Sequence, residues 1–228
     1  MPRCTFPIAG LIIAILHSSA MAQQQTGRFY PLDHRQVPGT AAQWQAIAKP
    51  GLYGYMQPVR ISMPGEATVS YYNGSPHADI DVQAPAQARM MVGQVYRVRL
   101  SGIAGHPGLE LFPTIEVLDR LHPPEGKLDT FPIPIEITEQ ELVAAAQDRL
   151  VTKVIYLEHP QTAAPVTDVN QRRVDEFDPR VNLLEAADVR GRPMAILRMG
   201  GRIPDPNAPT DEFYSASPLQ ITALPPKE

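Results

Sequence analysis

Short stretches in which apolar and polar residues alternate follow one another along most of the chain from residue 51 onward. Such alternation places successive side chains on opposite faces of an extended strand. For example, Val98 and Leu100 are apolar, whereas Arg97 and Arg99 are charged. The tyrosine-rich run that precedes Asn73-Gly74 indicates a strand entering a two-residue hairpin turn. In all, the pattern predicts eight strands, at residues 52–61, 67–72, 77–82, 92–100, 109–117, 133–137, 151–158 and 194–199.

Two segments between the strands have helical spacing instead. Thr138 followed three residues later by Glu141 is the pattern of a capping box, and apolar residues at helical intervals come after it. Asn182 has the side chain expected at the start of a second short helix, which Gly191 would end. We therefore expect one well-defined helix after residue 138 and a shorter one after residue 182.

Residues 23–50 carry little apolar surface and are expected to form an irregular leader. Within this leader, Thr40 could cap a further short helix over residues 41–48. Trp44 and Ile47 are three residues apart, so they would share one face of that helix. We expect these two side chains to anchor the leader onto the rest of the protein.

Strands that succeed one another, without strict alternation with helices, favour a mostly β fold. The expected architecture is an antiparallel β-sandwich or a partly open barrel with two or three short inserted helices. Pro132 and Pro134 place the strand at 133–137 at a sheet edge, because proline donates no ladder hydrogen bond. The apolar run 194–199 is expected near the centre of a sheet. The predicted organisation is a β-rich domain at 51–203 with a polar loop at 159–181, followed by a proline-rich tail at 204–228.

Residues 1–22 have the features of a secretory signal peptide. Arg3 precedes an apolar run at 8–16, and Ala20 and Ala22 are the small residues that signal peptidase requires. The alternative is an N-terminal anchor that is never cut. Cleavage after Ala22 would leave 206 of the 228 residues and remove Cys4, the only cysteine. The mature chain would then have no disulfide, no thiolate nucleophile and no Cys-ligated metal site.

The charge of the chain argues against two classes of partner. Its formal net charge is −4, and loss of Arg3 with the signal peptide would make it −5. Without a basic cluster, nucleic acid and anionic membrane surfaces are not expected as partners. No segment after the signal peptide approaches the ~20 apolar residues of a membrane span. We expect an exported protein, in the periplasm, in the cell envelope or outside the cell.

His77, Asp79 and Asp81 form the sharpest candidate for a metal site. In an extended strand these alternate residues point to one face, with about 6.6–7 Å between neighbours. They could contribute ligands to an ion if other residues converged on the same place. The alternative is a solvated face, because apolar residues such as Ile80 and Val82 would turn the opposite face toward the core.

Several other polar groups could belong to a site. His106 and Glu110 flank a tight turn and could act as an acid–base pair, or could simply be solvent-facing. Paired carboxylates at strand ends could serve glycoside hydrolysis, although such residues are common there. Exposed tyrosines could bind a sugar or a protein, or could fill the core instead. The carboxylates and nearby histidines in question are Glu116, Asp119, His122, Glu158 and His159. The tyrosines are Tyr53, Tyr55, Tyr71 and Tyr72.

No signature of a known catalytic or cofactor-binding motif is present, and no cofactor is expected. The leading hypothesis is therefore a non-enzymatic envelope protein that binds or scaffolds another envelope protein. The first alternative is an exported hydrolase or metal-dependent enzyme that acts on envelope polymers. The second alternative is a glycan-binding module. The residues most suited to a binding surface are Tyr53, Tyr55, His106 and Glu110.

Five stretches together resemble a group of exported proteins of unknown function from bacteria with elaborate cell envelopes. The resemblance spans about residues 51–204 and implies export and one main domain, but no activity or ligand. The stretches are 53–59 (YGYMQPV), 105–114 (GHPGLELFPT), 131–136 (FPIPIE), 154–158 (VIYLE) and 192–202 (RPMAILRMGGR).

Overall fold

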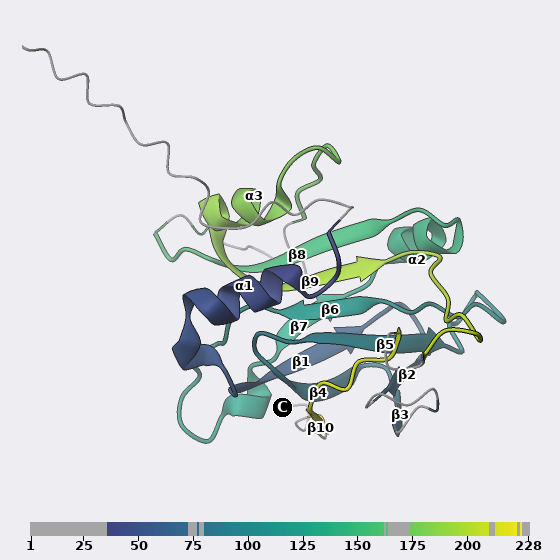
Figure 1. The fold of residues 1–228 in the computed structure, drawn as a ribbon, viewed down its shortest axis with the longest axis horizontal. Coiled ribbons are helices and arrows are strands. Elements are labelled where there is room, and N and C mark those ends of the chain that lie inside the picture. Colours follow the sequence, from purple (N-terminus) through teal and green to yellow (C-terminus); the bar gives the residue numbers. More distant parts are fainter. Residues whose placement is uncertain are drawn as a thin grey trace, which may run out of the picture.

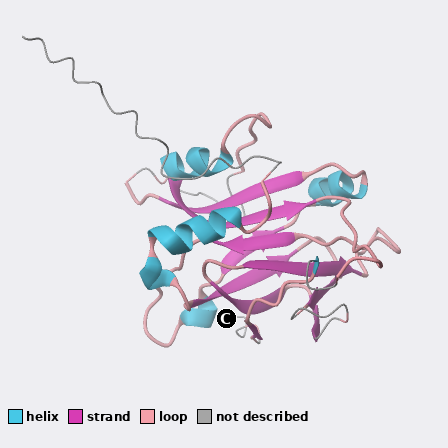
Figure 2. Cartoon of the chain, in the orientation of Figure 1, coloured by secondary structure: helices cyan, strands magenta, loops and turns pink. Residues whose placement is uncertain are grey.

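Two β-sheets packed face to face, with short helices around them, make up the protein (Figures 1 and 2). The computed structural model describes residues 36–72, 77, 80–161, 163, 174–209, 213–222 and 224. Within these residues there are ten strands and three α-helices, and the sheets do not close into a barrel. The mostly antiparallel, sandwich-like class predicted from the alternation of apolar and polar residues is confirmed. The predicted signal peptide lies outside the described residues.

The larger sheet has six strands, all antiparallel to their neighbours. Their order is β3-β2-β5-β6-β9-β8. The apolar run predicted to be central forms part of β9, which lies between β6 and β8, so that prediction is confirmed. The strands are β2 (Thr68–Tyr71), β3 (Ile80–Gln83), β5 (Val95–Ser101), β6 (Thr114–Val117), β8 (Val151–Glu158) and β9 (Gly191–Met199).

The smaller sheet has four strands in the order β10-β4-β1-β7. β7 lies at its edge, as Pro132 and Pro134 predicted. β7 runs parallel to β1, which is the one parallel pairing in the described sheets. The strands are β1 (Met56–Ser62), β4 (Ala86–Met91), β7 (Ile133–Glu136) and β10 (Leu219–Ile221).

The helices α2 (Glu139–Ala146) and α3 (Leu183–Arg190) begin where their capping residues predicted. In α2, the Glu141 amide donates to the Thr138 hydroxyl and the Thr138 amide donates to the Glu141 carboxylate, which completes the capping box. In α3, the Asn182 side chain accepts from the amide of Leu184. Two 3₁₀ turns, η1 (Pro50–Leu52) and η2 (Leu128–Thr130), complete the set. No helix in the described part of the chain is long and apolar enough to cross a membrane.

The helix predicted in the leader is present as α1 (Thr40–Ala48). The prediction that Thr40 caps it is wrong, because Gly39 is the N-cap residue and no side chain of the described residues caps the helix. The helix also docks through a different face. Ala41 and Ala42 are buried, whereas Trp44 and Ile47 are exposed, so the expected anchoring by the two large side chains is wrong. Small residues let the helix lie close to the turn between β4 and β5. A Cβ added at Gly93 in that turn would come within 2.9 Å of the Ala46 Cβ.

Apolar side chains from both sheets form the main core between them. Val59 and Ile61 of the smaller sheet and Val98 and Leu100 of the larger one are almost fully buried there. The outer face of the larger sheet is covered at two places. α1 and α3 cover it near β6 and β9, around Leu118, Leu184 and Ile196 (Figure 1). Phe213 and Tyr214 cover it near Tyr72 and Phe112.

Two local predictions from the sequence are wrong. β2 and β3 pair with Tyr71 opposite Ile80, whereas a two-residue turn at Asn73-Gly74 would place Tyr71 opposite Pro76. Asn73 and Gly74 themselves lie outside the described residues. β4 was not predicted as a strand at all, because its Ala, Gln, Arg and Met residues have low β propensity even though they alternate.

The C-terminal segment, expected as a tail, takes part in the fold. Phe213 and Tyr214 pack against the outer face of the larger sheet. β10 then adds to the free side of β4, with Gln220 opposite Arg89. The segment therefore runs from one sheet of the sandwich to the other.

Candidate functional site

Glu116 and Arg198 form a buried ion pair on the outer face of the larger sheet. Glu116 Oε1 lies 3.3 Å from Arg198 Nη2, and the Glu116 side chain has no exposed area. The other carboxylate oxygen accepts from the amide of Ala42 in the first turn of α1, at 3.3 Å. A carboxylate at this end of a helix is favourable, because the free amides there carry partial positive charge. The arrangement fixes α1 to the sheet.

Asp119 is tied to the other end of α1 through the side chain of the residue that follows the helix. Lys49, which follows the helix, places its Nζ 2.7 Å from Asp119 Oδ2, and Arg192 Nε lies 3.8 Å from the same oxygen. His122 is exposed. Glu116 and Asp119 are thus each engaged by cations under a helix. These contacts assign structural roles to the carboxylates considered for hydrolysis.

His106 and Glu110 do not pair with each other. His106 Nε2 lies 2.6 Å from Glu139 Oε1 in the first turn of α2. Glu110 Oε1 lies 3.4 Å from Arg99 Nη1 on β5. The acid–base pair considered from the sequence is therefore not formed, and each residue joins a loop to a different element.

The polar face of β3 belongs to a row of side chains that crosses three strands. Ser70 is paired with Asp81 on one side and with Arg99 on the other. The Ser70 hydroxyl accepts from Arg99 Nη2 at 3.2 Å, and Arg99 reaches toward Asp81 at 4.0 Å. His77 is exposed, and Asp79 lies outside the described residues. No three His, Cys, Asp or Glu side chains in the described ranges are grouped as a metal site would require.

The four tyrosines selected from the sequence lie in different surroundings. Tyr71 is buried in the core and Tyr72 packs against Tyr214, with their ring centroids 4.3 Å apart. Burial raises the pKa of Tyr72 to about 12. Tyr55 is half-buried, with the Arg120 guanidinium 4.8 Å from its ring centre. Tyr53 is 66% exposed and is the one of the four that is open to solvent.

Sequence reasoning missed an arginine–aromatic cluster on the outer face of the larger sheet. The Arg97 guanidinium lies 4.1 Å from the ring centre of Phe213, and Arg202 lies 5.8 Å from the same ring. Burial, with a contribution from Arg202, lowers the pKa of Arg97 to about 10. The alternation along β5 could have placed Arg97 on this face, but nothing in the sequence indicated that Phe213 would cover it.

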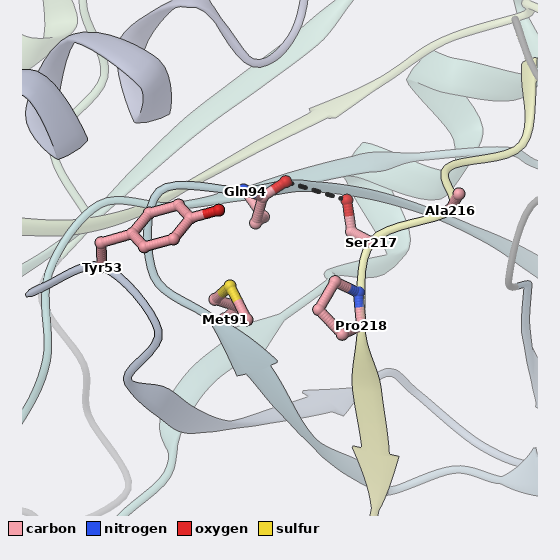
Figure 3. A pocket seen from close by; sticks show the side chains of 6 residues that line it. All are labelled: Tyr53, Met91, Gln94, Ala216, Ser217 and Pro218. Carbon is pink, nitrogen blue, oxygen red and sulfur yellow. Dashed lines mark hydrogen bonds between the residues drawn. The ribbon is translucent and has the colours of Figure 1, made fainter.

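A shallow pocket of about 370 Å³ lies between Tyr53 and the C-terminal segment (Figure 3). Its base includes Met91 at the end of β4, and Gln94 stands beside it in the turn before β5. The opposite wall is Ala216, Ser217 and Pro218. Of the residues that line it, only Tyr53 was selected from the sequence. The residues of the C-terminal wall lie more than 120 positions further along the chain than the other lining residues, so no local pattern connects them.

Three of the four edges of the described sheets, those of β7, β8 and β3, differ in how they are protected. β7 carries Pro134 and is flanked by Lys153 from β8, whose Nζ bonds the Glu136 carbonyl at 2.7 Å. The helix α3 packs against β8. At the end of β8, Glu158 is followed by His159, whose amide donates a hydrogen bond to the Arg190 carbonyl. β3 contains neither proline nor lysine, and Ile80 at its start is 45% exposed. Among the described elements, β2 alone pairs with β3.

Comparisons with protein-family models, with curated proteins and with solved structures find no match to this chain.

Proposed function

We propose that this chain is an exported, non-enzymatic protein of the bacterial cell envelope that binds another envelope protein through the open edge of β3. The observation that carries the proposal is this edge, whose outward backbone groups pair with no other described strand and which carries a half-exposed isoleucine. Such an edge is a template for a strand from another chain, and proteins normally protect it. Binding by strand addition uses those backbone groups for affinity and neighbouring side chains for specificity.

The side chains around β3 suit an extended polar segment with an apolar residue opposite Ile80. Ile80 offers the apolar contact, and Asp81 and Gln83 beside it are exposed and polar. Ser70 and Arg99 continue the polar row onto the neighbouring strands. Export, and the envelope as the place of action, are supported by the signal-peptide pattern and by the resemblance at residues 51–204.

The site geometry favours binding over catalysis. Glu116 and Asp119 are held in ion pairs under α1, and His106 and Glu110 bond to different partners. The hydrolase considered from the sequence requires at least two such groups to converge on a free site. The described residues offer no such convergence, so the hydrolase has no support from them.

The test is cross-linking in intact cells, followed by capture of the tagged protein carrying Ile80→Lys or Leu157→Lys. Both substitutions place a lysine on an edge strand of the same sheet at a nearly equal exposure, 45% for Ile80 and 46% for Leu157. We expect a stoichiometric envelope partner that Ile80→Lys loses and Leu157→Lys retains. A partner retained by both variants, or lost equally by both, would contradict binding through β3.

A further inference from the structure

The pocket beside Tyr53 joins two distant parts of the chain into one concave surface. Tyr53 follows the 3₁₀ turn η1, whereas Ser217 and Pro218 belong to the C-terminal segment (Figure 3). The volume of about 370 Å³ lies within the range of small-ligand sites, roughly 300–1,000 Å³. None of the groups around β3 lines this pocket, so the inference is independent of the proposed protein-binding edge.

Partly buried hydrogen bonds hold the C-terminal wall of the pocket in place. The phenol of Tyr96 donates to the Pro218 carbonyl at 2.6 Å and accepts from the Met91 amide at 2.6 Å. The Ser215 and Ser217 hydroxyls both reach the carbonyl oxygen of Val95, at 2.6 and 3.0 Å. The floor and this wall are therefore tied to β4 and β5, and a ligand does not have to order them on binding.

The chemistry of the lining indicates which ligand fits. Tyr53 supplies an exposed aromatic ring, and Met91 and Pro218 supply further apolar surface. Gln94 and Ser217 supply an amide and a hydroxyl, which are joined by a 3.3 Å hydrogen bond. None of the residues lining the pocket is charged. An ionic ligand would find no counter-charge in this lining, whereas a neutral polar one finds hydrogen-bonding groups.

We infer that this pocket binds one unit of a neutral saccharide. A sugar ring combines an apolar face, which packs on an aromatic ring, with a rim of hydroxyl groups. The Gln94 amide and the Ser217 hydroxyl can exchange hydrogen bonds with that rim. Tyr53 is the principal contact, because it is the one aromatic residue in the lining and is 66% exposed.

The inference is tested by saturation-transfer NMR with the mature protein and cellotetraose, chitotetraose, maltotetraose and laminaritetraose as probes. We expect transfer to at least one of these neutral oligosaccharides and none to a polygalacturonate fragment, which is anionic. Tyr53→Ala should weaken that binding roughly tenfold, equivalent to about 1.4 kcal/mol. Tyr53→Phe, which keeps the ring, should bind as the wild type does.

Phe131→Ala is the matched control, because Phe131 is also an exposed aromatic residue but does not line the pocket. It should leave the affinity unchanged, and circular dichroism should show all three variants to be folded. Absence of transfer to all four neutral probes would overturn the inference. Binding that survives Tyr53→Ala, or that is equally strong for the anionic fragment, would overturn it as well.

Discussion

Tyr96 on β5 donates its phenolic hydrogen to the carbonyl oxygen of Pro218, 122 residues further along the chain, at 2.6 Å. The same oxygen atom of Tyr96 accepts from the Met91 amide. Tyr71, on the neighbouring strand β2, is equally buried, but its hydroxyl has no hydrogen-bond partner among the described residues. The two phenols are therefore buried to the same degree, but only that of Tyr96 is hydrogen-bonded within the described structure.

The same substitution should have opposite effects at these two tyrosines. Tyr96→Phe removes two hydrogen bonds and leaves their partners unsatisfied, so it should lower the free energy of unfolding by about 1–2 kcal/mol. Tyr71→Phe removes a buried hydroxyl that bonds to none of the described residues, so it should leave stability unchanged or raise it by up to about 1 kcal/mol. Urea denaturation of both variants measures the difference. Equal destabilisation by the two substitutions would contradict the hydrogen-bond assignment.

Stability should fall in alkaline solution. Burial raises the pKa of Tyr71 and of Tyr96 above the ordinary value of 10.0, and that of Tyr72 to about 12. Above the pKa that tyrosine has in the unfolded chain, the unfolded chain releases these phenolic protons while the folded chain retains them. Ionisation of the tyrosines therefore favours unfolding. The contribution of these tyrosines is thus complete below about pH 10 and is lost as the pH rises further.

Urea midpoints at about pH 9 and about pH 11 measure this loss. Tyr71→Phe should reduce the difference between the two midpoints, because it removes one of the titrating groups. A midpoint that stays constant across the range, or a difference that Tyr71→Phe leaves unchanged, would contradict the burial of the Tyr71 phenol.

The Glu116–Arg198 pair should be essential for the attachment of α1. Glu116→Gln keeps the shape of the side chain but leaves the Arg198 charge buried without compensation. We expect a loss of about 3 kcal/mol in the free energy of unfolding. The double variant Glu116→Gln, Arg198→Met removes both charges and should recover part of that loss. If the double variant is less stable than Glu116→Gln alone, the pair is not the source of the effect.

Export should leave a mature chain that begins at Gln23. Cleavage after Ala22 removes the apolar run and Cys4, so the intact mass should correspond to 206 of the 228 residues without a thiol. Mass spectrometry of the protein from the periplasm or the medium makes the measurement. Ala22→Leu should block processing, because the peptidase requires a small residue there. A chain that keeps Met1 in the membrane fraction would show an uncut anchor instead.

The sequence was informative where the local pattern determined the structure. β8 begins and ends at the predicted residues because branched and aromatic side chains favour an extended chain. α2 begins at the predicted place because its capping box is local. β4 was missed since its residue types are typical of helices, and β10 since it has three residues and forms only against β4.

The candidate site could be predicted only in part, for a related reason. Tyr53, which the sequence suggested as a possible contact residue, is exposed and lines a pocket. Its partners Ser217 and Pro218 depend on the path of the C-terminal segment, which no local pattern encodes. Likewise, His106 and Glu110 are close in sequence, but the tertiary fold gives His106 a carboxylate partner and Glu110 a guanidinium partner from elsewhere.

Site-specific photo-cross-linking tests the proposed binding through β3 most directly. A photoreactive amino acid is placed at position 80 in one variant and at position 157 in another, and both are activated in intact cells. Binding at β3 predicts that position 80 cross-links to one envelope protein, while position 157, of nearly equal exposure, does not. No adduct at position 80, or the same adducts at both positions, would contradict it.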